Sequence, residues 1–298
     1  MLFNNLLAEQ NIDPASVLVL RHTPKPEDGE LRENLPLLAD ERPEIFNAYQ
    51  STQTKKVEAK MLRAKYVASF IGLEKRKNST EQAAVFVGLY EIGDRRPLTY
   101  KQFWEEPAYQ QLKEYGMQGF VEGSRSFVLW FDLTLVNFYE KWKGKLIIEW
   151  PRPAVTWSRF ASNAQFPIAS ILEDSALHKP MPDWKDFIRT SAQLRTLPRA
   201  WRERLSQWRG IYYLFDRKDG KGYVGSAYGE ENILGRWEYY AASGHGGNVH
   251  LRGRSPENFE FSILELVSQS LDKNAVIDLE NSWKDRLHTR LPFGLNGN

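Results

Sequence analysis

Cysteine is absent from this chain of 298 residues. Its absence excludes disulfide bonds and thiolate metal sites, and it fits a reducing compartment such as the cytoplasm. No apolar run approaches the roughly 18 consecutive residues that a membrane-spanning helix needs. A basic segment followed by a long apolar run is also missing from the first residues, MLFNNLLAEQNIDPAS. We therefore expect a cytoplasmic protein without a secretory signal.

A strong excess of one charge is also lacking. The formal net charge is +2, so composition alone does not indicate a nucleic-acid-binding protein. No G-x-x-x-x-G-K-[ST] run occurs, which excludes an ATP-binding loop of that type. Apolar residues make up 42% and aromatic residues 13% of the chain, enough to bury one or two cores, and the length suits two domains.

Positive charge gathers in two segments of the chain. Residues 53–77 carry eight Lys and Arg side chains against two Glu, and residues 185–209 carry seven against two acidic residues. The basic residues are Lys55, Lys56, Lys60, Arg63, Lys65, Lys75, Arg76 and Lys77 in the first segment, and Lys185, Arg189, Arg195, Arg199, Arg202, Arg204 and Arg209 in the second. Such segments can neutralise phosphates. The alternative, two solvated helix faces, stays open. Arg202 and Arg209 are candidate DNA contacts.

The first 183 residues predict an α+β domain. Residues 40–66 and Tyr100–Tyr115 have helical character, and residues 151–183 are rich in proline and predict loops and short strands. Apolar runs rich in Val, Ile, Phe and Tyr predict strands at Tyr66–Leu73, Ala84–Ile92, Phe127–Leu135 and Lys145–Trp150. We expect these strands to form a β-barrel-like sheet with helical insertions.

Residues 184–209 predict a basic helical connector, because apolar residues recur at intervals of three and four from Leu194 to Trp208. Beyond the connector, residues 210–215 and 222–225 predict two strands joined by a turn at Asp219-Gly220, a good hairpin signal. A helix near 232–242, a glycine-rich loop at 243–248, a strand at 258–266 and a helix near 273–290 follow. This order predicts a small α+β domain with an antiparallel sheet over 210–298.

Five ordered features of this domain carry a family resemblance. Gly210-Ile211-Tyr212 and Tyr223-Val224-Gly225 stand on the two hairpin strands, Arg236 follows on a helix, Glu280 lies on the last helix, and Gly294-Leu295-Asn296 comes near the end. In this order and spacing, residues 210–296 resemble a GIY-YIG endonuclease domain. The resemblance covers under a third of the chain. It implies a nuclease that hydrolyses phosphodiester bonds in DNA.

The resemblance assigns catalytic roles that suit the residue types. Tyr212 and Tyr223, on neighbouring strands, would present two hydroxyls to one site, and the first is implied as a general base or as a water-positioning group. The guanidinium of Arg236 would donate two hydrogen bonds to phosphate oxygens and offset the negative charge of the transition state. Lys221 is a further candidate cation. Tyr240, one helical turn after Arg236, stands where many family members have histidine.

Glu280 is the candidate metal ligand. One carboxylate, with water and substrate oxygens completing the coordination shell, suits Mg²⁺ (or Mn²⁺), whereas zinc prefers His or Cys ligands. Glu265 is a weaker ligand candidate. His245 and Asn248, in the glycine-rich loop, are candidate DNA contacts, although that loop also looks like a turn that needs positive φ. Asn296 is expected to tie the tail to the domain.

The N-terminal region weakly resembles PUA-like readers of modified bases, which take a base into an aromatic pocket. Trp104, Trp130, Trp150 and Trp157 are candidate pocket walls, and the alternative is that each belongs to the core. Together these features predict a restriction or defence endonuclease. Two alternatives stay open: a nucleic-acid-binding protein with an inactive nuclease fold, and a DNA-repair nuclease. Cutting both strands would require a homodimer or successive nicks.

Overall fold

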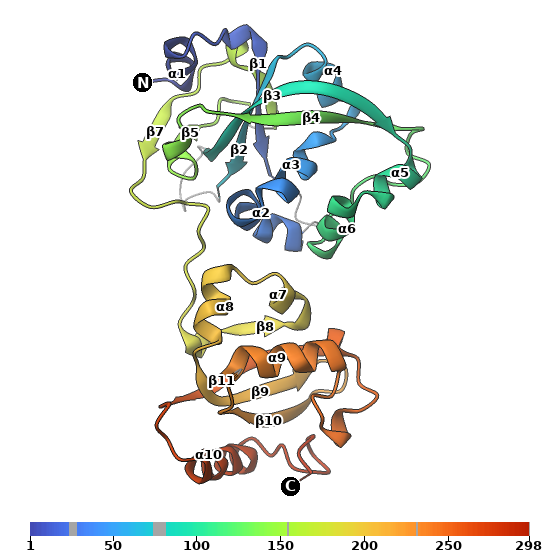
Figure 1. Ribbon diagram of the computed structural model, residues 1–298, viewed down its shortest axis with the longest axis vertical. Helices are drawn as coiled ribbons and strands as arrows, with labels where there is room; N and C mark the ends of the chain where they lie inside the picture. Colours follow the sequence, from blue (N-terminus) through green and yellow to red (C-terminus); the bar gives the residue numbers. More distant parts are fainter. Residues whose placement is uncertain (24–28, 74–81, 154, 231, 298) are drawn as a thin grey trace. The chain divides into compact units, whose positions relative to one another are not determined.

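Two compact units make up the computed structural model, Met1–Lys179 and Pro180–Asn298 (Figure 1). The structure describes residues 1–23, 29–73, 82–153, 155–230 and 232–297. Both units combine helices and strands, as the expected α+β class requires. Lys75, Arg76 and Lys77 of the first basic segment lie outside the described residues. Within the described ranges, no helix has both the length and the apolar composition needed to cross a membrane.

The N-terminal unit is built on a curled sheet of seven strands. They are β1 (Val17–His22), β2 (Tyr66–Gly72), β3 (Ala83–Leu98), β4 (Val128–Val136), β5 (Leu146–Glu149), β6 (Ser158–Phe160) and β7 (Ile168–Ile171). Pairing runs β6-β1-β2-β3-β5-β7, with β4 also on β3. Among the described strands of this sheet, β1–β2 is the one parallel pair.

This sheet does not close into the expected barrel. Among the described strands, β6 and β7 end the pairing order and do not pair with each other. The cause lies in β3, a strand of 16 residues. It pairs with β5 near its start and with β4 along its later half, so the sheet branches at this strand. The result is an open, twisted sheet (Figure 1).

Helices cover both faces of this sheet. They are α1 (Phe3–Glu9), α2 (Gly29–Glu41), α3 (Pro43–Ser51), α4 (Lys55–Met61), α5 (Tyr100–Glu105) and α6 (Pro107–Glu114). Val17 and Val19 pack in one cluster with α1, whereas Leu18 and Leu20 pack with α4 on the other face. A strand buried on both faces is a continuous apolar run rather than an alternating one. The predicted single helix at 100–115 is two helices, because Pro107 starts the second.

The C-terminal unit holds a four-stranded antiparallel sheet in the order β10-β9-β11-β8. Its strands are β8 (Ile188–Thr190), β9 (Arg209–Asp216), β10 (Lys221–Ala227) and β11 (Phe259–Val267), and its helices are α7 (Ser191–Arg195), α8 (Arg199–Leu205), α9 (Asn232–Ser243) and α10 (Lys273–Arg286). Short 3₁₀ helices occur in both units. Those of the N-terminal unit are η1 (Pro14–Ser16), η3 (Glu140–Trp142) and η4 (Ala161–Asn163), and those of the C-terminal unit are η5 (Trp184–Asp186), η6 (Val249–Leu251) and η7 (Pro256–Asn258). The last α-helix ends at Arg286, earlier than expected.

Residues 184–209 are not a separate connector. They supply β8, which pairs with β11, and α7 and α8, which pack in the same core as α9. Leu194, Trp201 and Leu205, the residues that gave the helical rhythm, are buried in that core. The apolar repeat was therefore a sign of packing against the rest of the C-terminal unit.

The C-terminal sheet lies between two helical layers. Leu214 and Phe261 face the layer that contains Trp237 of α9, whereas Ile211 and Val224 face Val276 of α10. Alternate residues along β9 therefore belong to opposite layers, as the two-residue period of a strand requires. The candidate catalytic residues come from both layers.

Candidate active site

Tyr212 and Tyr223 lie on the same face of the β9–β10 hairpin. The register pairs Tyr212 with Gly225 and Leu214 with Tyr223, so the two tyrosines are diagonal neighbours. Such neighbours are within reach of each other when the side chains are long. The separation expected from the sequence is therefore present, with β10 as the outer strand of the sheet.

Gly225 makes room for the Tyr212 side chain. A Cβ built at Gly225 would lie 2.6 Å from Cζ of Tyr212, well inside van der Waals contact. The phenol ring therefore crosses the partner strand where that strand has no side chain. The glycine of the second half-motif is needed because of this close approach.

Substitution of Gly225 by alanine tests this packing. We expect Gly225→Ala to reduce the free energy of unfolding by about 1–3 kcal/mol, the usual cost of adding a methyl group to a filled core. Gly229→Ala is the matched control, because a Cβ there would meet nothing within 4 Å. Urea unfolding measures both variants. Equal stability of the two would contradict the close approach.

Helix α9 brings Arg236 and Tyr240 over the same face. The Tyr212 hydroxyl donates to the Tyr240 hydroxyl at 3.2 Å, and Arg236 Nη2 donates to that same oxygen at 3.2 Å. The rings of Tyr223 and Tyr240 are 5.9 Å apart. Tyr212, Tyr223 and Tyr240, here called the tyrosine cluster, thus surround one guanidinium.

The three phenols of the tyrosine cluster are protonated at neutral pH. Burial is the main cause that raises the pKa of each above its ordinary value near 10. A neighbouring tyrosine adds to the rise in every case, whereas Arg236 opposes it at Tyr212 and Tyr240. Neutral hydroxyls donate and accept hydrogen bonds, so the cluster is suited to orienting a water molecule or a phosphate oxygen.

Glu280 approaches β10 from α10. Ser226 of β10 donates to Glu280 Oε2, and Lys284 Nζ lies 2.7 Å from Glu280 Oε1. The Glu280 charge also contributes, after burial and the Tyr240 hydroxyl, to the raised pKa of Tyr223. Glu280 is therefore electrostatically coupled to the tyrosine cluster across the outer strand.

Lys284 is a member of the site that the sequence reasoning missed. Its side chain is only 2% exposed, which is rare for a lysine unless it is paired. Its partner Glu280 is one helical turn earlier on α10. A Glu followed four residues later by a Lys was therefore the sequence signal that could have identified Lys284. The pair holds the Glu280 carboxylate in one orientation.

The donor set at Glu280 fits Mg²⁺ better than zinc. Among the described residues, no group of three His, Asp or Glu side chains gathers to hold a metal. An ion at Glu280 would therefore depend on water and phosphate oxygens, as Mg²⁺ commonly does. Ser226 and Lys284 each bind one carboxylate oxygen, which leaves each oxygen a second lone pair for a metal.

The residues near the C-terminus lie along the free edge of β10. Leu295 N donates to Gly222 O at 2.9 Å, and the Asn296 side chain bonds both backbone groups of Val224, at 2.9 and 2.8 Å. Lys221 Nζ donates to Pro292 O at 3.2 Å. Asn296 thus ties the tail to the domain, as its position in the sequence indicated. Lys221 stands on β10 two residues before Tyr223.

The glycine-rich loop packs against the tyrosine cluster. A Cβ at Gly246 would lie 2.6 Å from Cδ1 of Tyr240, and this glycine has a φ of +50°. Asn248 caps η6 by accepting from His250 N at 2.8 Å, and its side chain also bonds Tyr223. His245 Nδ1 accepts from Gly247 N at 2.9 Å. Asn248 therefore adjoins the site, whereas His245 stabilises the loop.

Three other candidates have structural partners. Arg202 pairs with Glu238, and Arg209 donates to the carbonyls of Tyr228 and Gln269. Glu265, the weaker ligand candidate, accepts from Trp283 Nε1 at 2.9 Å. These bonds join parts of the C-terminal unit to each other.

The four tryptophans of the N-terminal unit do not share one pocket. Trp150 is 4% exposed within the core, and its Nε1 donates to Thr156 O at 2.8 Å. Trp104 and Trp130 pack on the edge of another core cluster. Trp157 lines a cleft in this unit. Aromatic content alone did not distinguish core residues from cleft residues.

Comparisons with known proteins give one likeness. No family model matches this chain, and no curated protein matches it. Among solved structures, the chain is similar to the catalytic domain of the homing endonuclease I-TevI. The identity is 29%, the match covers 30% of this chain and 98% of that chain, and the TM-score is 0.25. A TM-score this low carries no weight for function.

Proposed function

We propose that this chain is a divalent-metal-dependent endonuclease of the GIY-YIG type that hydrolyses phosphodiester bonds in DNA. One observation carries the proposal. The tyrosine cluster and Arg236 converge on one face of the β9–β10 hairpin, with Glu280 coupled to them across β10. Hydrolysis needs an oriented water, a cation for the charge of the transition state, and help for the leaving oxygen. The residues present can meet each need.

Arg236 is the residue proposed to bind the scissile phosphate. Its guanidinium is partly buried, and Nε has no hydrogen-bond partner among the described residues. A buried donor of this kind gains from a phosphate oxygen that accepts from it. The Tyr240 hydroxyl accepts a hydrogen bond from Arg236 Nη2, and this bond fixes the orientation of the guanidinium.

The Tyr212 hydroxyl is proposed to position the attacking water rather than to deprotonate it. Because burial raises its pKa, the phenolate is scarce at neutral pH. Lys221 and Asn248, on either side of Tyr223, are proposed to contact phosphate oxygens. Glu280 would hold one Mg²⁺ or Mn²⁺, which when bound supplies Lewis acidity for the phosphate and its leaving oxygen.

The N-terminal unit is proposed to select the DNA target, with restriction or defence as the biological role. Its separate cores allow it to fold as a unit of its own. A modified base is the proposed mark, the cytoplasm is the proposed compartment, and a homodimer is the proposed state for cutting both strands.

A specific observation favours a second candidate, a nucleic-acid-binding protein whose nuclease fold is inactive. Both Glu280 oxygens are already bonded, to Ser226 and to Lys284, as a purely structural carboxylate would be. The two candidates differ in one respect: only the nuclease needs Glu280 for a metal-dependent reaction.

A cleavage assay tests the proposed function. The purified full chain is incubated with Mg²⁺ and with plain and cytosine-modified duplexes, and the ends of any products are sequenced. We expect cleavage of at least one duplex, abolished by EDTA. Intact DNA throughout the panel, with Mg²⁺ and with Mn²⁺ in turn, would contradict the proposal.

A further inference from the structure

A cleft of about 960 Å³ opens in the N-terminal unit, which contains none of the residues assigned to hydrolysis. Its volume is typical of a site for a small ligand. Two half-buried aromatic side chains line it, Tyr49 from α3 and Trp157, above the core residues Phe103 and Phe120, which are 2% and 5% exposed. Flat rings of this kind form walls that suit a flat, heterocyclic ligand.

Polar side chains are buried where β1 ends at this cleft. His22 lines the cleft yet is only 2% exposed, and Gln50 and Ser69 behind it are fully buried. Gln50 Nε2 donates to Asn47 Oδ1, and Gln50 Oε1 accepts from the Ser69 hydroxyl. Buried polar groups are costly unless they are satisfied, so such a group in a core needs an explanation.

One atom of this group is not satisfied. His22 Nε2 is buried and has no hydrogen-bond partner in the part of the chain that the structure describes. Burial lowers the pKa of His22 to about 4, against a bond with Gln50 that raises it, so the imidazole is neutral near pH 7. The rings of Phe46 and Tyr49, at 5.5 and 5.3 Å, fix its orientation. The imidazole bonds the Gln50 side chain, and Nε2 is its buried nitrogen without a partner in the described residues. As an acceptor, Nε2 would take a ligand N–H.

The charge of the cleft favours an anion. Arg21, Lys55 and Arg125 line it, although Arg125 is paired with the buried Glu58 and so adds no net charge to the rim. No Asp or Glu is among the described residues that line the cleft. Arg21 is 6% exposed, and burial and the nearby Arg159 both lower its pKa. Arg21, which has little exposure to water, therefore lies near the positive charge of Arg159. An anionic ligand would stabilise this arrangement.

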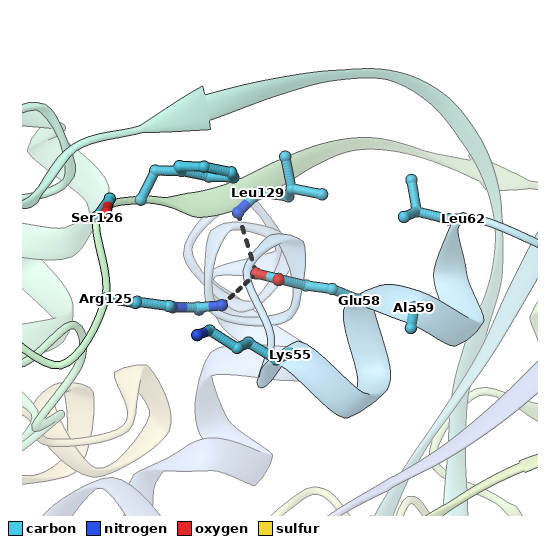
Figure 2. Close-up of a pocket in the computed structure, with 8 residues that line it drawn as sticks. Lys55, Glu58, Ala59, Leu62, Arg125, Ser126 and Leu129 are labelled. Carbon is cyan, nitrogen blue, oxygen red and sulfur yellow. Dashed lines mark hydrogen bonds and ion pairs between the residues drawn. The ribbon is translucent and has the colours of Figure 1, made fainter.

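The chain at the start of β4 is bonded to Glu58 of α4 (Figure 2). Arg125 donates to Glu58 Oε1 at 2.9 Å and to Gln53 O at 2.7 Å, and Leu129 N donates to the same carboxylate oxygen at 3.0 Å. Glu58 is itself buried on α4. The loop before β4 is therefore tied to α4, which lowers the entropy that ligand binding would otherwise cost.

We infer that this cleft binds one nucleotide unit. Its heterocycle lies between the aromatic walls and donates an N–H to His22 Nε2, while its phosphate meets the cations of the rim. The unit is either a base turned out of a DNA duplex or a free nucleotide, since both present the same chemistry. The inference rests on the proposed function in one respect: it assumes that the N-terminal unit binds nucleic acid.

Calorimetry on the full chain in EDTA tests the site without any cleavage. The probes are the four deoxynucleoside 5′-monophosphates, 5-methyl-dCMP, and inorganic phosphate. We expect at least one nucleotide to bind with a Kd below about 1 mM and at least tenfold more tightly than phosphate. His22→Phe should weaken that binding at least tenfold. His178→Phe, at an exposed histidine paired with Asp40, should leave it unchanged.

A second pair of variants guards against misfolding of the His22 variant. Val121 lines the cleft and is 61% exposed, so Val121→Glu adds a carboxylate at little risk to the core. It should weaken nucleotide binding several-fold relative to Val121→Gln. A duplex with 2-aminopurine at a mismatch distinguishes the two sources, because its fluorescence rises when the base leaves the stack.

Three results would overturn the inference: no nucleotide binds, phosphate binds as tightly as the nucleotides, or His22→Phe and Val121→Glu both bind like wild type. Nucleotide binding by a chain that cleaves nothing would contradict the proposed nuclease function alone. Cleavage by a chain that binds no nucleotide would contradict this inference alone.

Discussion

Glu280→Gln should reduce metal-dependent DNA cleavage by about a thousandfold, a rise of about 4 kcal/mol in the activation barrier. Glutamine keeps the shape of the side chain and a carbonyl oxygen that can accept from Lys284, but it removes the charge that balances the buried Lys284. It also lacks the negative charge that a divalent ion requires. We therefore expect losses in kcat, in metal affinity and in stability, and urea unfolding identifies conditions in which the variant is folded.

Glu265→Gln is the matched control for that variant. Glu265 lies on β11 of the same sheet and accepts from Trp283 Nε1, a bond that glutamine can keep. It should cleave at the wild-type rate. Single-turnover cleavage over a range of Mg²⁺ concentrations measures both variants. If Glu280→Gln cleaves as fast as Glu265→Gln, Glu280 is a structural partner of Lys284 and not the metal ligand of the reaction. The inactive-fold alternative gains only if the wild-type chain cleaves no DNA either.

Tyr212→Phe should lower the rate of cleavage by about a hundredfold, the effect expected when one preorganised hydrogen bond to the reacting groups is removed. The variant loses only a hydroxyl. That hydroxyl bonds Tyr240, so the cost in stability should be about 1 kcal/mol. Because burial raises the pKa of Tyr212 above the ordinary range, the wild-type rate should show no rise from phenol ionisation between pH 6 and about 9.

Tyr213→Phe is the control that the strand itself provides. Tyr213 is the next residue of β9, but it packs in the cluster with α10 on the opposite face. Loss of its hydroxyl should leave cleavage unchanged. Equal rates for the two variants would remove Tyr212 from the proposed chemistry, whereas a marked pH dependence lost only in Tyr212→Phe would restore it as a base.

Most of the C-terminal unit was predictable because its signals are local. A hairpin is specified by a turn and by alternating residues within about fifteen positions, and Tyr212, Tyr223 and the intervening turn satisfy both. The convergence of Arg236 and Tyr240 follows from one turn of a helix. The predicted roles of these side chains remain proposals.

Other features depend on distant partners, and the sequence alone did not reveal them. Strand β8 has three residues and exists because β11 lies beside it, more than sixty positions later in the chain. The branch of the N-terminal sheet at β3 depends on pairing with β4 and β5, which come tens of residues later in the chain. The cleft is outlined by residues from 21 to 157, and its buried histidine has no local motif.

The outer edge of β10 has a consequence for assembly. Gly222 O and both backbone groups of Val224 are already bonded to Leu295 and Asn296. A second copy therefore finds these groups occupied and cannot extend the sheet through them. Two copies that cut opposite strands of a duplex would have to associate through other surfaces, such as side chains, the opposite sheet edge at β8, or their N-terminal units. In such a pair, the β9–β10 hairpin of each copy would contact its own DNA strand. The two hairpins would not be parts of one continuous sheet.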